Sequence, residues 1–218
     1  MACCGHCQEA GELFTDEKAL TELREYRRSG APNTPTRLLI DGLKTLDLSS
    51  TTLLDVGGGV GMIQHELMEA GVSEATLVEA SPAYLKVAEN ETRRRGHADR
   101  ASFRHGDFVD LAPELPEADL VTLDRVICCY PHMTELIQAS TAKATRWYGV
   151  TYPRTRWFLR WAKPVTDLYC WWKDMEFRIY LHEGVDEAIQ SAGFRRFYQT
   201  ETFLWNVALY ERPEAVTA

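Results

Sequence analysis

Short runs of aliphatic and β-branched residues alternate with longer stretches of helical periodicity through the middle of the chain. The runs predict strands at residues 52–56, 76–79, 101–104, 119–123 and 147–152. Between them, apolar positions three and four residues apart predict helices over residues 61–70, 82–95 and 133–145. Strands that alternate with helices are typical of βαβ units, so we expect an α/β fold with a parallel sheet.

The two ends of the chain follow other patterns. Near the start, Asp16 can cap a helix that runs to about residue 28, and a second helix is expected after Pro35. Near the end, a helix over residues 183–192 precedes two long apolar runs, at residues 194–203 and 205–211. Because only a tight turn separates the two runs, we predict an antiparallel hairpin that closes the parallel sheet.

Residues 154–182 do not fit the alternation. Two interpretations remain open, an insertion that packs on the domain and a lid over a ligand, and both can hold together. An insertion after the carboxyl end of a strand lies where open α/β sheets bind ligands. The segment is rich in aromatic side chains: Trp157, Phe158, Trp161, Tyr169, Trp171, Trp172, Phe177 and Tyr180.

Composition limits the choice of partner and compartment. With 218 residues, 45% of them hydrophobic, the chain can form one domain with a full core. We divide it into a cysteine-bearing arm and helical cap (1–48), a main domain (49–212) and a tail (213–218). The net charge of −8 argues against nucleic acid as partner. No apolar run approaches the ~20 residues of a membrane span, and no signal peptide is visible, so we expect a cytoplasmic protein without stable membrane insertion.

The first residues carry three cysteines. Cys4-Gly5-His6-Cys7 is the Cys-Gly-His-Cys pattern of disulfide isomerases, and with Cys3 it offers soft metal ligands. In a reducing compartment the six cysteines are not a disulfide framework. No second thioredoxin signature is present, and so short a loop could not bring four ligands to one zinc ion. We expect no metal site and an exposed arm, with folding of the arm over the active site as the alternative.

A glycine-rich loop gives the strongest functional signal. Asp55 ends the first predicted strand, and Gly57, Gly59 and Gly61 follow at the start of a helix. Glycines let a backbone turn tightly and approach a ligand closely. The glycines stand closer together than in the Gly-x-Gly-x-x-Gly loop that holds a pyrophosphate, which favours a ligand without one.

The next two strand ends carry matching polar groups. Glu79 ends the second strand, about 20 residues beyond the glycine loop, where an acid binds ribose hydroxyls. Asp107 and Phe108 follow the third strand, where an acid and an apolar ring can hold the edge and face of an adenine. Three successive strand ends therefore each offer a contact to a nucleoside.

On these residues the chain resembles the class I methyltransferases that use S-adenosylmethionine. The resemblance covers about residues 50–212. It implies a Rossmann-like, seven-stranded, mostly parallel sheet with an antiparallel C-terminal hairpin, together with the N-terminal helical cap and the helical insertion. It also implies S-adenosylmethionine as cofactor, with Asp55 and the glycines around its methionine part, Glu79 on its ribose, and Asp107 with Phe108 at its adenine.

The later part of the chain resembles magnesium-protoporphyrin O-methyltransferases. This narrower similarity rests on Tyr130-Pro131, on residues 177–182 and on the final hairpin. In that family a histidine directly precedes the Tyr-Pro pair and is thought to assist catalysis, and here Cys129 occupies that position. A tyrosine on the family's N-terminal cap corresponds to Tyr26.

Methyl transfer needs a nucleophile aligned with the sulfonium carbon and often a base. Asp124 follows the fourth strand, near the transfer point, and we count it among the cofactor-binding candidates. Cys128 and Cys129 are adjacent, so we expect them to face opposite ways, one of them toward the core. The candidate catalytic residues are Tyr26, Cys129, Tyr130, His132 and His182.

We therefore expect a methyltransferase that acts on an O or S atom of a small molecule. Three alternatives stay open: S-methylation of sulfide, small thiols or a thiophilic metalloid; O-methylation of a tetrapyrrole carboxylate; and a non-catalytic cofactor-binding or redox or metal-binding protein. No Asn-Pro-Pro-Tyr motif follows the fourth strand, which argues against methylation of nucleobases or protein glutamine. The oligomeric state stays open.

Overall fold

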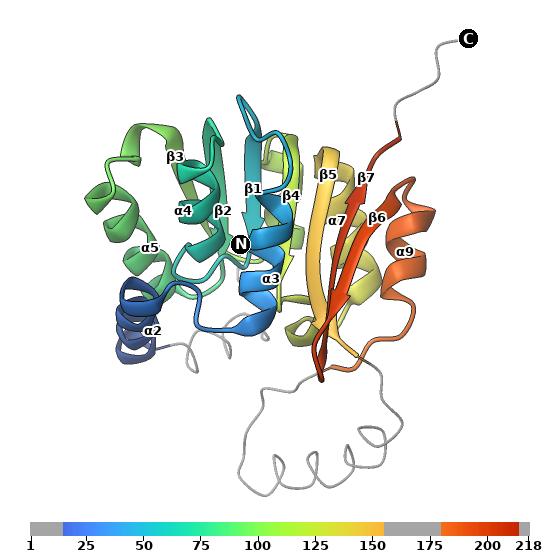
Figure 1. Cartoon of the computed structure of the whole chain (residues 1–218), viewed down its shortest axis with the longest axis horizontal. Helices are drawn as coiled ribbons and strands as arrows, with labels where there is room; N and C mark the ends of the chain where they lie inside the picture. Colours follow the sequence, from blue (N-terminus) through green and yellow to red (C-terminus); the bar gives the residue numbers. More distant parts are fainter. Residues whose placement is uncertain (1–14, 155–179, 214–218) are drawn as a thin grey trace, which may run out of the picture.

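The computed structural model describes residues 15–154 and 180–213 (Figure 1). These residues form one seven-stranded sheet in the order β3-β2-β1-β4-β5-β7-β6. β1 to β5 run parallel to one another, and β7 lies antiparallel between β5 and β6. The strands are β1 (Thr52–Val56), β2 (Glu74–Glu79), β3 (Ala101–His105), β4 (Ala118–Asp124), β5 (Ala144–Pro153), β6 (Arg195–Glu201) and β7 (Trp205–Glu211). The predicted parallel sheet and C-terminal hairpin are confirmed.

Helices cover both faces of the sheet (Figure 1). On one face, α3 contacts β5 and β7, α4 contacts β1 and β2, and α5 contacts β2 and β3. On the other face, α7 contacts β4 and β5 and packs on α9. The helices are α2 (Asp16–Ser29), α3 (Thr34–Leu43), α4 (Met62–Glu69), α5 (Pro82–Arg94), α6 (Phe108–Leu111), α7 (Met133–Lys143) and α9 (Val185–Ser191).

The alternating direction of side chains along the central strands explains this three-layer arrangement. In β1, Leu53 packs into the core on the side of α3 and α4, while its neighbour Leu54 packs into the core on the side of α7 and α9. Successive side chains of a strand point to opposite faces. A strand whose neighbouring residues are both apolar must therefore be covered on both sides, as parallel strands are.

Several element boundaries differ from the sequence prediction. Thr15, rather than Asp16, caps α2, because its Oγ1 accepts the N–H of Lys18 at 3.5 Å. The helix predicted over 133–145 ends at Lys143, and β5 begins at once with Ala144, which pairs with Ala118 of β4. Pairing with the neighbouring strand thus takes the last two predicted helical residues.

The N-terminal helices attach to the domain in different ways. α3 lies on the sheet, whereas α2 packs on α5 near the carboxyl ends of the strands (Figure 1). The Glu91 side chain of α5 is 0% exposed and accepts hydrogen bonds from the Nε atoms of Arg27, Arg94 and Arg95 at 3.0, 2.8 and 2.9 Å. Arg27 belongs to α2, so this cluster joins the cap helix to the domain.

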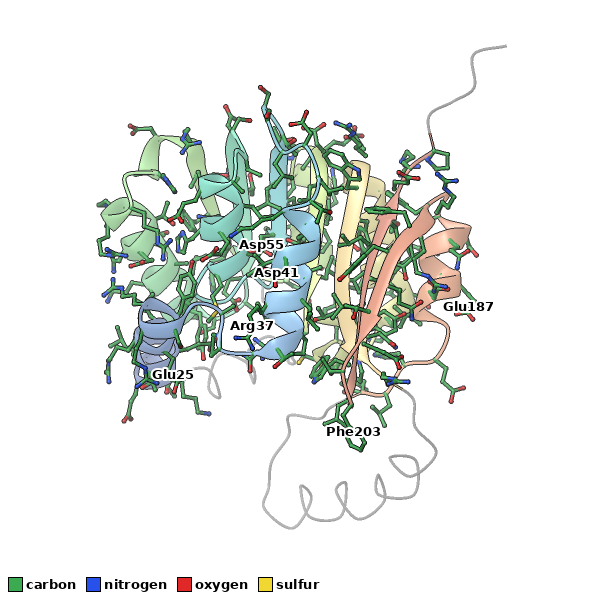
Figure 2. All side chains as sticks on the ribbon, in the orientation of Figure 1. Glu25, Arg37, Asp41, Asp55, Glu187 and Phe203 are labelled. Atoms are coloured by element: carbon green, nitrogen blue, oxygen red, sulfur yellow. The ribbon has the colours of Figure 1, made fainter. Side chains whose placement is uncertain are left out.

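Some predictions concern residues outside the described ranges. These are the cysteine arm with Cys3, Cys4, His6 and Cys7, the aromatic insertion over 155–179, and the tail beyond residue 213. Within the described ranges, Phe203 in the β6–β7 turn is 65% exposed and is labelled in Figure 2. Within the described ranges, no helix has both the length and the apolar character needed to cross a membrane.

Candidate functional site

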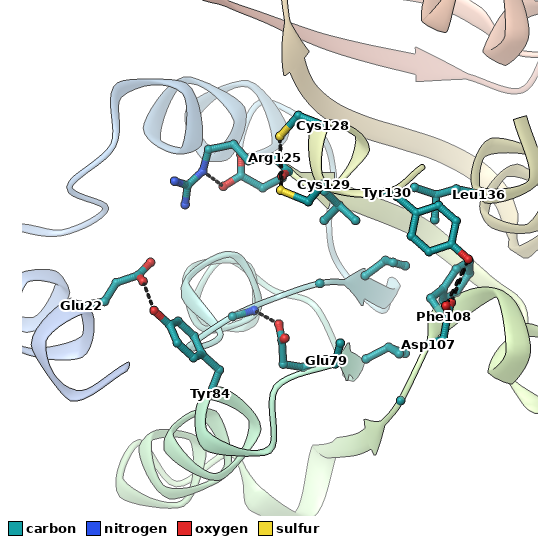
Figure 3. Close-up of a pocket in the computed structure, with 18 of the residues that line it drawn as sticks. Glu22, Glu79, Tyr84, Asp107, Phe108, Arg125, Cys128, Cys129, Tyr130 and Leu136 are labelled. Carbon is teal, nitrogen blue, oxygen red and sulfur yellow. Dashed lines mark hydrogen bonds and ion pairs between the residues drawn. The ribbon is translucent and has the colours of Figure 1, made fainter. Parts of the chain in front are cut away.

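A cavity of about 340 Å³ lies at the carboxyl ends of β1 to β4 (Figure 3). Because these strands are parallel, their ends meet at one edge of the sheet, the usual ligand position in open α/β folds. The volume falls within the range of pockets for small molecules. The lining residues that the strand ends supply are Val56, Gly57, Gly59, Val78, Glu79, Ala80, Gly106, Asp107, Phe108, Asp124, Arg125 and Val126.

The glycine loop brings bare backbone to this cavity. Gly57 has a φ of 64° and donates its N–H to the carbonyl of Val78 at 2.8 Å. A Cβ at Gly57 would lie 2.5 Å from Val126 Cγ2. At Gly58, which is not among the predicted site residues, a Cβ would lie 2.6 Å from Asp55 Oδ2 and 2.8 Å from the Leu77 side chain. Both positions therefore need glycine for space.

Glu79 links the glycine loop to the next turn. Its Oε2 accepts the N–H of Gly59 at 2.9 Å (Figure 3). Its Oε1 accepts the N–H of Ser81 at 2.8 Å. Burial raises the pKa of the Glu79 carboxyl, and the backbone N–H donors oppose that shift. The carboxylate is thus oriented by the backbone and lies on the cavity wall.

Asp107 and Tyr130 form the far end of the cavity. Asp107 caps α6 by accepting the N–H of Val109 at 2.9 Å. Tyr130 donates its hydroxyl to the same carboxylate, 3.1 Å from Oδ1 and 3.2 Å from Oδ2. Phe108 is buried beside them and also lines the cavity.

Asp124 stands at the end of β4 between two hydroxyl donors. Its Oδ2 accepts from Thr36 and its Oδ1 from Thr151, each at 2.6 Å. Arg125 follows with a φ of 60°, which is uncommon for a residue other than glycine. The Arg125 N–H donates to Thr151 Oγ1 at 2.7 Å, and its guanidinium pairs with Asp124 at 3.3 Å. Such backbone strain is typical of functional sites.

The two cysteines after β4 do not face opposite ways. Cys128 is buried, as expected for one of the pair, but both side chains line the cavity and their Sγ atoms are 3.5 Å apart. The residues form a 3-10 helix over Ile127–Cys129. Successive side chains of a 3-10 helix are about 120° apart, because it has three residues per turn, whereas those of a strand alternate. The prediction of opposite orientations is therefore wrong.

Four other predicted site residues do not line the cavity. Asp55 is 0% exposed, accepts from Thr122 Oγ1 at 2.7 Å, and has its pKa raised to about 7 by burial. Gly61 caps α4. His132 precedes α7 with its ring edge against Tyr130, and His182 has its Nε2 2.8 Å from the Tyr130 carbonyl oxygen.

Tyr26 lies away from the cavity. It is 3% exposed, stacks on His65, and donates its hydroxyl to Glu66 Oε1 at 2.9 Å. Glu22, one helical turn earlier, lines the cavity instead and accepts the hydroxyl of Tyr84 at 3.1 Å (Figure 3). Residues 22 and 26 lie on the same side of α2, so the cap helix does reach the site, but through Glu22. Nothing in the local sequence pattern distinguished Glu22 from the other acids of α2.

A second cavity of about 420 Å³ adjoins the first one on the side of α2. Glu22, Tyr84 and Arg125 line both cavities. The remaining lining residues of the second cavity are Glu17, Lys18, Thr21, Glu25, Pro32 and Asn33. The two cavities therefore share part of their wall.

Comparisons with known proteins agree with this geometry. The family model described as a methyltransferase domain matches residues 47–156. A magnesium protoporphyrin IX methyltransferase from Synechocystis PCC 6803 with bound SAM is 15% identical, with a TM-score of 0.69, over 98% of this chain and 100% of that one. The same protein with bound SAH is 18% identical, with a TM-score of 0.67, over 93% and 99% of the two chains.

An O-methyltransferase family 2 protein from Planctomyces limnophilus in complex with apigenin is 18% identical, with a TM-score of 0.64, over 91% of this chain and 62% of that one. Identities this low show the shared fold. A search of curated proteins found no significant match.

The cavity fits a nucleoside-type cofactor on its own geometry. Bare backbone lies along the glycine loop, and two oriented carboxylates, Glu79 and Asp107, lie on the wall. Together with the family match over half of the chain, these features settle the class of protein. The chain belongs to the methyltransferase domain family and is a class I methyltransferase that uses S-adenosylmethionine.

Proposed function

We propose that this protein transfers a methyl group from S-adenosylmethionine to an O or S atom of a small molecule. The observation that carries the proposal is the pair of adjoining cavities, which share Glu22, Tyr84 and Arg125. The first offers the nucleoside contacts of a cofactor, and the second has room for a small acceptor beside it. A net charge of −8 does not favour nucleic acid as the acceptor.

In this proposal, different residues of the first cavity bind different parts of the cofactor. Glu79 binds the ribose hydroxyls, and Asp107 with Phe108 holds the adenine. The glycine loop lets the methionine part approach the backbone, with Asp124 at the transfer end. When bound, the cofactor supplies an electrophilic methyl group on a sulfonium. The protein's task is to align the acceptor with it and to exclude water.

Cys129 and Tyr130 are the candidates to contact the acceptor, since both line the cavity. His182 takes a positioning role in this proposal, because its Nε2 lies 2.8 Å from the backbone carbonyl oxygen of Tyr130. His132 packs its ring against Tyr130 and takes a similar role. Tyr26, buried between α2 and α4, leaves the set of catalytic candidates.

Two specific acceptors have separate support. The full-length similarity to the Synechocystis magnesium protoporphyrin IX methyltransferase favours a tetrapyrrole carboxylate. The cysteine pair in the cavity wall favours a soft acceptor, such as sulfide, a small thiol or a thiophilic metalloid. The cytoplasmic location and the lack of a nucleic-acid partner stay predictions from composition.

Release of S-adenosylhomocysteine by the purified protein tests the proposal. The acceptor panel comprises sulfide, small thiols, arsenite, phenols, carboxylates and a porphyrin, with a small amine as contrasting nucleophile. We expect turnover with one of the O or S acceptors. Tight cofactor binding without turnover on any of them would contradict the proposal and favour a non-catalytic binding protein. Turnover on the amine alone would contradict the choice of nucleophile.

Glu79→Gln tests the cofactor contacts directly. The variant keeps one acceptor oxygen but loses the charge that holds the Gly59 and Ser81 N–H groups. Hydrogen bonds to charged groups contribute about 1.5–3 kcal/mol, so we expect the dissociation constant for S-adenosylmethionine to rise about 10- to 100-fold. Isothermal titration calorimetry measures it.

Glu74→Gln is the matched control, because Glu74 is exposed at the other end of β2. It should change the affinity by less than about twofold. Equal affinities of the Glu79→Gln variant and the wild type would remove Glu79 from the cofactor site.

A further inference from the structure

The wall of the cofactor cavity holds two thiols side by side. The Sγ atoms of Cys128 and Cys129 are 3.5 Å apart, and they lie 3.2 and 3.5 Å from the carbonyl oxygen of Arg125. Figure 3 shows the two sulfurs joined by a dashed line beside Arg125. Neither cysteine is in a disulfide, and Cys129 is the more exposed of the two. The pair therefore belongs to the inner surface of the cavity.

The backbone fixes this arrangement from two sides. Within the 3-10 turn, Cys129 donates its N–H to the carbonyl of Val126 at 2.9 Å. From the segment after the insertion, Tyr180 donates its N–H to the carbonyl of Cys128 at 2.7 Å. The turn that holds the two sulfurs is thus anchored both locally and by a distant part of the chain.

A disulfide between these residues is a poor fit. The Cα atoms of adjacent residues are about 3.8 Å apart across a trans peptide, below the usual range of about 4.4–6.8 Å for a disulfide. A zinc ion is also a poor fit, because it takes about four ligands. Among the residues that the structure describes, no cluster of three or more histidines, cysteines and acids could hold a metal ion.

A single thiophilic atom that needs only two thiolates fits much better. An atom about 2.3 Å from each sulfur, the usual zinc–thiolate distance, would span the gap with an S–X–S angle of about 100°. That angle suits the pyramidal geometry of trivalent arsenic. In a monosubstituted arsenical, carbon occupies the third valence, so two thiolates complete its coordination.

We propose that Cys128 and Cys129 form a dithiol site that binds a trivalent arsenical inside the cofactor cavity. With an arsenoxide, two As–S bonds form, the arsenic–oxygen bond breaks, and the oxygen leaves as water with the two thiol protons. Arsenic stays trivalent, so the step needs no oxidant or reductant. This site goes beyond the proposed function, because it binds its ligand whichever acceptor is methylated.

The charge distribution around the pair supports the first step of capture. A hydrogen bond with Cys128 holds the pKa of the Cys129 thiol below its usual value, and the Arg125 guanidinium acts in the same direction. The thiolate is the form of cysteine that acts as a nucleophile. Cys129, the more exposed thiol, is therefore the one that attacks first.

Phenylarsine oxide is the probe for the test. The protein is the full chain with serine at Cys3, Cys4, Cys7 and Cys170, so that the pair provides its remaining thiols. We expect one arsenical per chain by native mass spectrometry and loss of both titratable thiols. In the same background, Cys128→Ser and Cys129→Ser should each bind about 100-fold more weakly, because the second As–S bond forms intramolecularly.

Two results would overturn the proposal. One is the absence of capture by the background protein, with its fold verified by circular dichroism. The other is equally tight capture by either single-cysteine variant. Cys128→Ala and Cys129→Ala repeat the comparison if a buried serine hydroxyl disturbs the turn.

Competition with the cofactor locates the bound arsenical. Since the pair and the cofactor contacts share one cavity, saturating S-adenosylhomocysteine should slow capture about tenfold or more, and an unchanged rate would place the bound arsenical elsewhere. Turnover on the acceptor panel is measured separately on the wild type. Failure of capture with intact turnover would contradict the dithiol site alone, whereas capture without turnover would contradict the proposed function alone.

Discussion

Replacing Gly57 by alanine should abolish measurable binding of S-adenosylmethionine and lower the free energy of unfolding by about 2–5 kcal/mol. The left-handed backbone at φ 64° costs a residue with a Cβ about 1–2 kcal/mol. The new Cβ would also lie 2.5 Å from Val126 Cγ2. Overpacking of this kind costs about 1–3 kcal/mol, and valine cannot readily rotate away, because β branching restricts its χ1 angle.

The Gly57→Ala variant should lose cofactor binding because relief of its backbone strain and overpacking moves residues of the cavity. Gly57 and Val126 both line the cavity, and Val126 begins the turn that carries the two cysteines. Any shift of either backbone therefore moves the cavity wall. Calorimetry measures the affinity, and urea denaturation measures the free energy of unfolding.

Gly96→Ala is the control for backbone strain alone. Gly96 has a φ of 76°, but a Cβ there would meet no atom within 4 Å. We expect a loss of about 1–2 kcal/mol in stability and an unchanged affinity for the cofactor. If both variants bind the cofactor as well as the wild type does, close packing of the glycine loop is not needed for cofactor binding.

Local sequence patterns were sufficient to predict the strands and the polar groups at their ends. In β1, apolar neighbours such as Leu53 and Leu54 indicate a strand buried on both faces. Glu79 and Asp107 could be placed at one edge of the sheet because parallel strands end together. These predictions depend on periodicity and on direction along the chain, both of which short segments carry.

Local sequence patterns did not predict the contacts between segments that are distant in the chain. Glu22 lines the cavity only because α2 packs on α5, some 60 residues away in the chain, where Tyr84 binds its carboxylate. The orientation of Cys128 and Cys129 depended on a 3-10 turn, and a run of apolar residues after a strand does not specify that turn. The sequence therefore predicted the cavity residues at the strand ends better than those that distant segments bring to the cavity.

The packing of α2 on α5 predicts a second large effect, a loss of stability on substitution of Glu91. Glu91→Gln should lower the free energy of unfolding by about 2–3 kcal/mol at pH 7, because it removes a buried charge that three arginines share. Arg27 and Arg94 remain 43% and 53% exposed, so water compensates part of the loss. Since Arg27 belongs to α2, protease cleavage in α2 should also become faster.

Glu69→Gln is the matched control. Glu69 also pairs with Arg95, but its side chain is 52% exposed. A pair of this kind contributes about 0–1 kcal/mol. Equal losses for the two variants would mean that burial of the Glu91 carboxylate adds nothing to the attachment of α2.

The pH dependence of the Glu91→Gln effect isolates the charge. Burial alone would raise the pKa of Glu91, but the hydrogen bonds from Arg94, Arg27 and Arg95 outweigh burial and hold the pKa well below its usual range. A carboxyl whose pKa is lower in the folded protein stabilises the fold above its unfolded pKa, about 4.3, and loses that contribution as the pH falls.

The difference in unfolding free energy between wild type and Glu91→Gln should therefore shrink by about 1–2 kcal/mol between pH 7 and pH 3. Other acids titrate alike in both proteins and cancel in the difference. A gap that stays constant over this range would show that shape and hydrogen bonding, rather than the charge of Glu91, hold the cap helix on the domain.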